Sequence, residues 1–531
     1  MPILQWLDKD KTIKKANQSP YRLLESDPSL SYGDQNSGNM LIQGDNLEAL
    51  KALLPYYANR VKCIYIDPPY NTGSAFEHYD DNLEHSKWLD MMYPRLELLR
   101  ELLTEDGIIV THIDDVEQPY LRVIMDEIFS RKNFVNCIAV QDSHPSGLKL
   151  SSKEKKIIKT KTYMVVYKKS DTMKIKPIYK KRHEWDTHFN IYMDVDSKYL
   201  KKELLKTVIM KYGVVDENFK LDKQSLLNQK FKDFCFKNRN KIFQSTKELP
   251  DEAKQLSLKI KDIPYEYISG GERNFALNGR RMSPLSKSLY NIGIDGEDKE
   301  DFAKLLCDFW DDVDFNNSQN EGGIQFPNSK KPEYLIARII TMFSSENDLI
   351  LDSFLGSGTT AAVAHKMNRR WIGIEMGEHA KTHCAARLQK VIDGEQGGIS
   401  KNVNWQGGGG FRFYHLGETI FDKDGCINKN IKFEHLAAHI WFSETKTPIT
   451  DKERSPLIGI YNKTAYYLLY NGILGDKSVS GGNVLTTKTL DALPKYNGKK
   501  VIYGETTRLS SLRLEENQIT FKQTPYDIKA R

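Results

Sequence analysis

The four residues Asp67-Pro68-Pro69-Tyr70 combine groups that could hold and activate an aromatic amine. Such an amine is a poor nucleophile because its lone pair is delocalised into the ring. A carboxylate and a backbone carbonyl that each accept one N–H would favour a more tetrahedral nitrogen, and Asp67 and the Pro68 carbonyl could supply them. The prolines fix φ and stiffen the turn, and Tyr70 offers a ring on which a base could stack. We predict these four as catalytic residues; the alternative is a strand end followed by a rigid turn.

A second segment, Asp352–Thr360 (DSFLGSGTT), has the composition of a ligand-binding turn. Its glycines allow the backbone to approach a ligand closely, and the helix expected after it would present free N–H groups to an anion. The segment is not a Walker A loop, because no lysine follows the second glycine at the required place. Glu375, 17 residues beyond Gly358, could hold the two hydroxyls of a ribose. The glycines alone would also fit a dinucleotide fold, and Glu375 alone could be a surface acid.

Alternating strands and helices are expected to position both segments. The apolar run 61–66 ends at Asp67, and the run 349–352 ends at the glycine turn. This alternation predicts an α/β unit with a parallel sheet, and ligands of such sheets bind beyond the carboxyl ends of the strands. The other expected strands are 40–42, 108–113, 135–140, 163–167 and 371–376, and the expected helices are 47–54, 88–103, 120–129, 333–343 and one from 359.

Composition indicates an ordinary globular protein. The chain has 531 residues, of which 39% are hydrophobic and 28% are charged, which suggests two to four domains. Its six cysteines are scattered without a CxxC pair, so we expect neither a disulfide framework nor a metal site. No apolar run approaches the ~20 residues that span a bilayer, and the first residues lack a signal-peptide pattern. We therefore expect a soluble protein of a reducing, cytoplasmic compartment, with no membrane partner.

Basic residues gather in the middle of the chain. Residues 151–260 contain 27 Lys and Arg against 14 Asp and Glu, whereas the formal net charge of the whole chain is only +6. A basic insert between two α/β halves is typical of a DNA-facing module. The alternative is a solvated, lysine-rich surface.

Together these residues resemble the DNA amino-methyltransferases of the circularly permuted "beta" order. In that order the D-P-P-Y tetrad comes first, the F-x-G-x-G cofactor turn comes late, and the target-recognition region lies between them. Here Asp67–Tyr70 comes first, then the basic insert, then Phe354–Gly358. Gly44-Asp45-Asn46 resembles the segment whose Asp contacts the adenine of the cofactor. Phe326–Pro332 (FPNSKKP), preceded by Trp310–Val313, resembles the motif that opens the cofactor pocket and places Lys331 near the carboxylate of the cofactor.

Later segments are similar to modification subunits of Type III restriction–modification systems. These segments are 394–401 (GEQGGISK), 405–411 (WQGGGGF) and 519–528 (ITFKQTPYDI). The resemblance covers about 40–140 and 305–531, and it does not usefully cover 171–300.

The resemblance implies a Rossmann-like methyltransferase core with an inserted recognition domain and a small α+β C-terminal domain. It implies the following division of the chain: an N-terminal arm 1–38, a catalytic half 39–150, a basic target-recognition insert 151–305, a cofactor-binding half 306–412 and a C-terminal domain 413–531. The implied cofactor is S-adenosylmethionine. The residues expected to bind it are Asp45, Lys331, Asp352, Phe354, Gly356, Gly358, Thr359 and Glu375.

The implied activity is methylation of N6 of a flipped-out adenine in double-stranded DNA, in the nucleoid-associated bacterial cytoplasm. Asp at the first position of the tetrad suits adenine, whereas Ser there would favour N4 of cytosine. The resemblance also implies a homodimer and a separate restriction subunit that carries helicase and nuclease. The alternatives are N4-cytosine methylation, methylation of RNA or protein, and a recognition module that serves a nuclease without catalysis.

Overall fold

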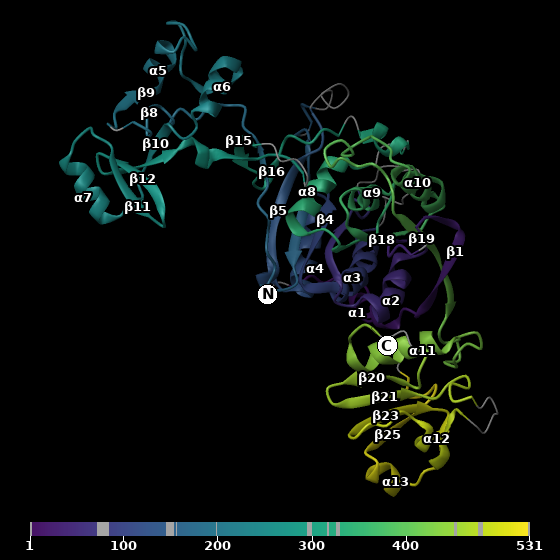
Figure 1. The fold of residues 1–531 in the computed structure, drawn as a ribbon. Helices are drawn as coiled ribbons and strands as arrows, with labels where there is room; N and C mark the ends of the chain where they lie inside the picture. The colour runs from purple at the N-terminus through teal and green to yellow at the C-terminus, as the bar shows by residue number, and fades with distance from the viewer. Residues whose placement is uncertain are drawn as a thin grey trace. The chain divides into compact units, whose positions relative to one another are not determined.

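The computed structural model describes the chain except residues 1–2, 35, 72–83, 145–152, 156, 198, 295–299, 316–317, 325, 327–329, 451–453, 476–481 and 529–531. The chain forms two compact units. Unit 1 combines Met1–Lys176 with Asp308–Arg531, and unit 2 is Pro177–Cys307 (Figure 1). In the described residues, none of the helices is both long and apolar enough to cross a membrane.

A large mixed sheet forms the centre of unit 1. Its middle strands, from β19 to β4 in the order below, are all parallel, whereas β1 and β6 run antiparallel to their neighbours. The order in the described residues is β1 (Arg22–Gly33), β19 (Gly410–Thr419), β2 (Met40–Gln43), β18 (Arg370–Glu375), β17 (Leu349–Asp352), β3 (Val61–Ile66), β4 (Leu103–Ile113), β6 (Lys161–Lys168), β5 (Phe134–Gln141) and β16 (Phe309–Trp310).

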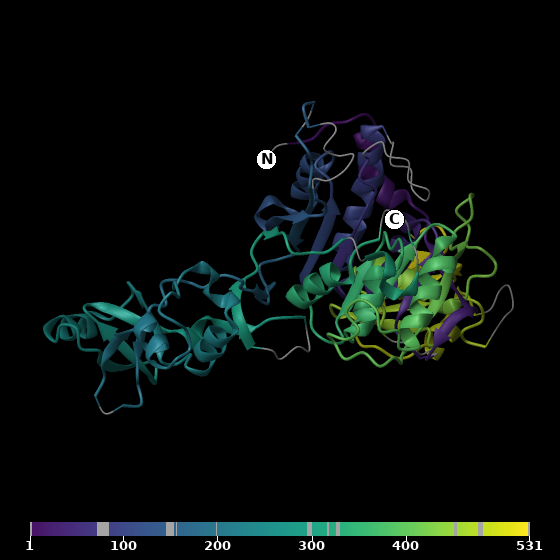
Figure 2. The same ribbon diagram turned by 90° about the horizontal axis from the view of Figure 1, so that it is seen from above.

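Helices cover both faces of this sheet (Figures 1 and 2). One face carries α1 (Lys9–Gln18), α2 (Asn46–Tyr57), α3 (His85–Leu102) and α4 (Gln118–Phe129), and the other carries α8 (Glu333–Phe343), α9 (Thr359–Lys366) and α10 (Ala386–Ile392). Because both faces are covered, the central strands are near-continuous apolar runs, and in β3 five of six residues are buried. The predicted Rossmann-like α/β core is confirmed.

The chain changes direction across the sheet between β17 and β3. These strands are parallel neighbours, with Ile350 beside Cys63. From β17 the chain continues to β18 on one side, whereas from β3 it continues to β4 on the other. Such a switch point leaves a crevice beyond the carboxyl ends of the two strands, where open α/β sheets bind ligands. Asp352 and Asp67 stand at these two ends.

Unit 2 has its own sheets and apolar cores. A six-stranded sheet and a three-stranded sheet pack against short helices, and Trp185, Phe189 and Phe231 are among the buried side chains. Its elements are β7 (Tyr179–Lys181), β8 (Ile191–Met193), β9 (Lys202–Leu204), α5 (Leu205–Lys211), α6 (Gln229–Lys237), β10 (Ile242–Thr246), α7 (Asp251–Lys259), β11 (Tyr265–Ser269), β12 (Glu272–Leu277), β13 (Arg280–Pro284), β14 (Leu289–Asn291) and β15 (Glu300–Leu305).

The C-terminal region of unit 1 is a small α+β fold, as the sequence predicts. A four-stranded sheet in the order β20-β21-β23-β25 packs against α11, with Ile440 and Leu468 in the shared core. Its elements are α11 (Phe433–Thr445), β20 (Leu457–Tyr461), β21 (Thr464–Leu468), β22 (Val484–Leu485), α12 (Thr487–Ala492), β23 (Lys499–Gly504), β24 (Thr506–Thr507), α13 (Ser511–Glu516) and β25 (Ile519–Gln523).

Three predicted boundaries need correction. Residues 1–38 are not an arm, because α1 packs against α3 and β1 pairs with β19. The insert begins at Pro177 rather than at 151, because β6 lies between β4 and β5 in the main sheet. The boundary at 413 falls inside β19.

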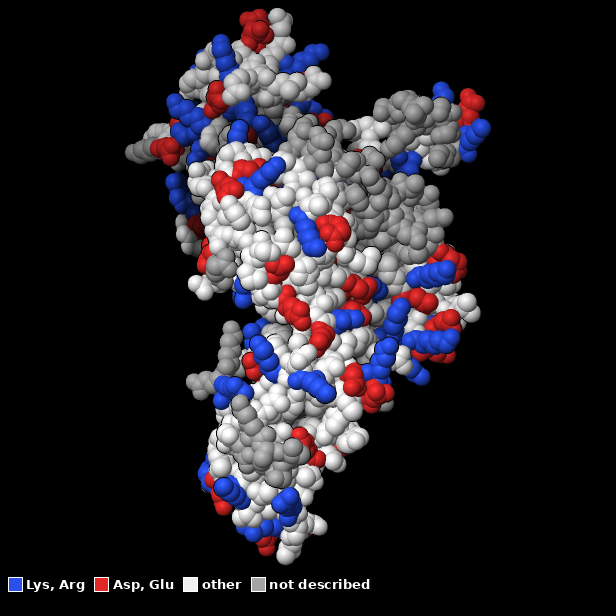
Figure 3. Space-filling view, turned by 90° about the vertical axis from the view of Figure 1, so that its right-hand side faces the viewer, with Lys and Arg blue, Asp and Glu red and all other residues white. Residues whose placement is uncertain are grey.

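With the insert beginning at Pro177, part of the excess of basic residues lies outside it. Unit 2 contains 25 Lys and Arg against 20 Asp and Glu, so much of the predicted excess lies before it, in 151–176. On the face shown in Figure 3, Lys and Arg lie among Asp and Glu rather than forming one field.

Candidate active site

Five acidic residues follow the carboxyl ends of five neighbouring parallel strands. Asp45, Asp67, Asp114, Asp352 and Glu375 stand at or just beyond the ends of β2, β3, β4, β17 and β18. Because these strands are parallel, their carboxyl ends lie along one edge of the sheet. The fold thus brings the two predicted segments, which are far apart in sequence, to the same edge.

The Asp67–Tyr70 tetrad is held by side chains on both sides. Tyr70 Oη donates a hydrogen bond of 2.8 Å to Asp67 Oδ1. Trp88 Nε1, from α3, donates one of 2.8 Å to the Pro69 carbonyl. Burial raises the pKa of Tyr70 well above its usual value, so its hydroxyl stays protonated and can donate.

Lys331 lies at the tetrad. Its ammonium forms an ion pair with Asp67 Oδ2 and stands 5.0 Å from the centre of the Tyr70 ring. Both oxygens of the Asp67 carboxylate are therefore bonded within the protein. The resemblance placed Lys331 near the carboxylate of the cofactor; the contact seen here is with the tetrad.

A buried histidine lies behind the tetrad. His112 Nδ1 is 2.9 Å from Tyr65 Oη, and its Nε2 is 2.9 Å from Thr162 Oγ1. Its ring centre is 6.1 Å from that of Tyr70. Burial, reinforced by Lys331, lowers the pKa of His112 well below its usual value, so the ring is neutral. Sequence analysis missed this residue, because a lone His in a strand carries no motif.

The glycine turn is built around Glu375. Gly356 and Gly358 have φ of 57° and 81°, in the left-handed region that glycine adopts without strain. Gly358 is the N-cap of α9. The Gly356 N–H donates to Glu375 Oε2 at 2.7 Å, and Glu375 Oε1 accepts from Met376 N at 2.8 Å and lies 2.9 Å from His379 Nε2. The carboxylate therefore fixes the turn.

Asp352 closes the start of the same turn. It accepts hydrogen bonds from Phe354 N at 2.9 Å and Thr360 Oγ1 at 2.6 Å. Burial raises its pKa to about 7, and the nearby charges of Asp67 and Glu375 add to the effect. Phe354 itself packs against the main core.

Asp45 caps α2 and is paired with an arginine. Its Oδ1 accepts from Leu47 N at 2.9 Å, and Arg95 Nη2 donates to its Oδ2 at 2.9 Å. The adjacent Asn46 Nδ2 donates to the Ser353 carbonyl at 2.7 Å, which ties this segment to the glycine turn. Arg95 lies 50 positions from Asp45, so its role was not visible in the sequence.

A network of buried charged side chains contacts Thr359, the first residue of α9. Arg387 Nη1 donates to Thr359 Oγ1 at 2.7 Å, and Arg387 Nη2 donates to Glu333 Oε1 at 2.7 Å. Lys366 Nζ donates to the other Glu333 oxygen at 2.8 Å. Residues 327–329, within the motif Phe326–Pro332, lie outside the described residues.

Comparison with known proteins follows this geometry. Residues 61–386, which contain the tetrad, the glycine turn and Glu375, match a protein family described as DNA methylase. The chain belongs to the DNA methylase family. The resemblance to DNA amino-methyltransferases that the sequence motifs predicted is thereby confirmed.

Several curated DNA methylases are similar to the chain. It is 35% identical over 407 residues to the probable type III restriction-modification enzyme HindVI Mod subunit of Haemophilus influenzae, covering 71% of the chain and 54% of that protein. It is 28% identical over 425 residues to the EcoPI Mod subunit of Escherichia phage P1, covering 69% and 61%. It is 27% identical over 398 residues to the type II methyltransferase M.KpnI of Klebsiella pneumoniae, covering 69% and 87%. The chain thus spans little more than half the length of the Mod subunits that it matches.

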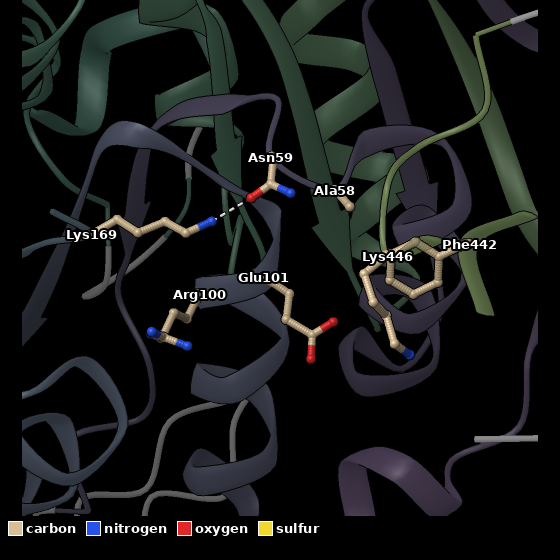
Figure 4. Close-up of a pocket in the computed structure, with 7 residues that line it drawn as sticks. All are labelled: Ala58, Asn59, Arg100, Glu101, Lys169, Phe442 and Lys446. Atoms are coloured by element: carbon tan, nitrogen blue, oxygen red, sulfur yellow. Dashed lines mark hydrogen bonds between the residues drawn. The ribbon is translucent and has the colours of Figure 1, made fainter. Parts of the chain in front are cut away.

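Unit 1 also has a hollow of about 340 Å³ at the other edge of the sheet (Figure 4). Lys169 Nζ there donates to Asn59 Oδ1 at 2.5 Å. The hollow lies where α2, α3 and α11 end, and cations near helix C-termini complement the negative ends of the helix dipoles. Its basic side chains thus have a structural explanation. The lining residues are Ala58, Asn59, Arg100, Glu101, Lys169, Phe442 and Lys446.

Proposed function

We propose that this DNA methylase uses S-adenosylmethionine to methylate N6 of adenine in DNA. The observation that carries the proposal is the switch point, which brings the Asp67 tetrad beside the glycine turn and Glu375. One side of the crevice suits an amine, and the other suits a nucleoside-like cofactor.

The residues around the glycine turn fit S-adenosylmethionine. Gly356 and Gly358 leave room for close approach, and the α9 N-terminus offers N–H groups to a carboxylate. Glu375 is the carboxylate that would accept from the ribose hydroxyls, which would take the place of some of its present partners. Ser353 Oγ is buried in this turn and makes no hydrogen bond within the described residues, which leaves a polar atom for a ligand. The cofactor, when bound, supplies a methyl group on a positively charged sulfur, and Glu375 together with the partly ionised Asp352 provides compensating negative charge.

The tetrad would prepare the target amine. Asp67 and the Pro68 carbonyl each accept one N–H, which frees the nitrogen lone pair, and Tyr70 stacks on the base. Lys331 occupies Asp67 Oδ2 until the amine takes its place. Transfer would need no covalent intermediate with the chain: the C–N bond would form as the C–S bond breaks, the neutral thioether S-adenosylhomocysteine would leave, and one N–H proton would be released to solvent.

Adenine and DNA are favoured by separate observations. Asp rather than Ser opens the tetrad, and the similar proteins include two Mod subunits of type III restriction-modification enzymes. Lys153 and Lys155 are exposed after β5, whose carboxyl end lies at the same edge as the tetrad, so they can contact phosphates. Unit 2 would read the target sequence.

Like the HindVI and EcoPI Mod subunits, the chain would act as a modification subunit. It would form a homodimer, join a restriction subunit and work in the bacterial cytoplasm, near the nucleoid. Light scattering of the purified chain tests the dimer, since a monomeric mass at micromolar concentration would contradict it. Co-purification with a restriction subunit encoded beside it tests that partner.

Methyl transfer can be measured directly on unmethylated plasmid. The protein or its Asp67→Asn variant is incubated with S-adenosylmethionine, and the nucleosides of the digested DNA are resolved by mass spectrometry. We expect N6-methyladenine with the wild-type protein and at least a hundredfold less with the variant, taking ~10²-fold as the cost of a lost electrostatic contact. N4-methylcytosine instead would reassign the base, and no methylated nucleoside would refute the activity.

A further inference from the structure

A fully buried carboxylate contacts the residue that follows the tetrad. Glu117 directly precedes α4, and its side chain is 0% exposed. Its Oε1 accepts a hydrogen bond of 2.7 Å from Asn71 Nδ2 and lies 2.9 Å from His85 Nδ1. Asn71 follows Tyr70, and His85 is the first residue of α3. One carboxylate oxygen therefore connects the loop after β3 with the starts of two helices.

This carboxylate is poorly suited to a purely structural role. Glu117 Oε2 and His85 Nε2 are both buried, and neither makes a hydrogen bond within the part of the chain that the structure describes. Burying a half-satisfied carboxylate costs stability. The side chain does not cap α4 either. Costs of this kind concentrate at functional sites.

The contact with Asn71 acts on the tetrad through the backbone. Asn71 has φ of 57°, in the left-handed region that Asn tolerates better than most residues. Trp88, three residues after His85 in α3, holds the Pro69 carbonyl at 2.8 Å. The tetrad is thus fixed at Pro69 by α3 and just after Tyr70 by Glu117.

We propose that Glu117 is a positioning residue for methyl transfer. By holding Asn71 and His85 it fixes the turn whose Pro68 carbonyl and Tyr70 ring meet the target base. This inference rests on the function proposed above, but it concerns a residue whose side chain contacts Asn71 and His85 rather than the tetrad itself. It predicts that activity depends on Glu117 while stability does not.

The test compares Glu117→Ala, Asn71→Ala and Glu117→Gln with the wild-type protein. The first two break the same contact from its two ends, so each should lower kcat about 10- to 100-fold, because misplacement near 1 Å costs about 10²-fold. The KM for S-adenosylmethionine should not change. The midpoint temperature of thermal unfolding should stay the same or rise. Glu117→Gln keeps an acceptor for Asn71, so its kcat should stay within about threefold. The matched control is Glu105→Ala, because the side chain of Glu105 is 70% exposed and lies at the other end of β4.

Two outcomes would overturn the inference. The first is a wild-type kcat in Glu117→Ala. The second is a fall in thermal midpoint and in cofactor binding that parallels the fall in kcat, which would show a structural role. A wild-type protein that transfers no methyl group would instead refute the proposed function itself.

Discussion

At the scale of single residues, the site is a set of carboxylates that the fold holds close together. Asp67, Asp352 and Glu375 follow three neighbouring strands, and each is engaged by a different group. Lys331 pairs with Asp67, the Gly356 N–H bonds Glu375, and Thr360 bonds Asp352. A positively charged ligand would relieve the repulsion among them, which agrees with the proposed cofactor.

The raised pKa of Asp352 predicts a pH-dependent stability. Because its pKa is about 7 in the folded chain and near 3.8 when unfolded, its contribution is full below about pH 4 and is lost as pH rises through 7. Between about pH 5 and pH 8 the wild-type protein should lose roughly 2–4 kcal/mol from this group, at about 1.4 kcal/mol per pKa unit. Urea unfolding of the wild-type protein and Asp352→Asn at both pH values measures the difference. An equal pH dependence in both proteins would contradict the assignment.

Sequence analysis found the residues that belong to local motifs and missed those that act across the chain. The tetrad, the glycine turn and Glu375 were visible because each follows an apolar strand. Arg95, His112 and Glu117 were not, since the contacts that define them join positions 32 or more apart or depend on burial. The contact between Lys331 and Asp67 spans 264 positions and depends wholly on the fold.

At the scale of elements, three helices that meet at the glycine turn share buried charges. Glu333 of α8, Lys366 of α9 and Arg387 of α10 have side chains that are 0% exposed. The two cations neutralise one carboxylate, and Glu395 adds a second acid beside Lys366. The network fixes the three helices relative to one another and supports Thr359.

Replacing Glu333, the central acid of this network, should strongly lower the free energy of unfolding. Glu333→Leu leaves the buried Arg387 without its carboxylate, and breaking a buried pair typically costs about 3–5 kcal/mol. Urea unfolding measures the loss, with Glu378→Ala as control because that acid is 76% exposed and its contacts with Lys381 and Gln43 lie at the surface. The control should change stability by no more than about 0.5 kcal/mol. A Glu333→Leu protein as stable as the control would show that the network is dispensable.

Strands of the core were predictable because parallel strands covered on both faces are continuous apolar runs. The expected strands 61–66 and 349–352 coincide with β3 and β17. Unit 2 was not predictable, since its strands are short and several are largely exposed. The N-terminal elements were missed because no residue of β1 is fully buried and its polar sequence resembles a loop.

At the scale of the whole molecule, unit 2 is an insertion with closely spaced ends. Leu306 N donates to the Ile178 carbonyl at 2.8 Å, and β15 pairs with β7. Both connections to the core, at Lys176 and Asp308, therefore leave unit 2 at one place. Such an insertion can vary with the target sequence without disturbing the core.

Deleting unit 2 should separate cofactor binding from DNA recognition. A chain in which a short glycine linker joins Lys176 to Asp308 keeps every strand of the main sheet, so it should fold and bind S-adenosylmethionine like the full chain. Its preference for specific over random duplex, typically 10³-fold or more in such proteins, should disappear. Calorimetry with the cofactor and filter binding with both duplexes measure the two properties. Retained sequence preference would move target recognition into unit 1.

The most direct test of the account is single-molecule sequencing of DNA from cells that produce the wild-type protein or Asp67→Ala. We expect N6-methyladenine at one short motif with the wild-type protein and none at that motif with the variant. The same signal in both samples, or methylation that follows no motif, would contradict the assignment of Asp67 and of sequence-specific adenine methylation.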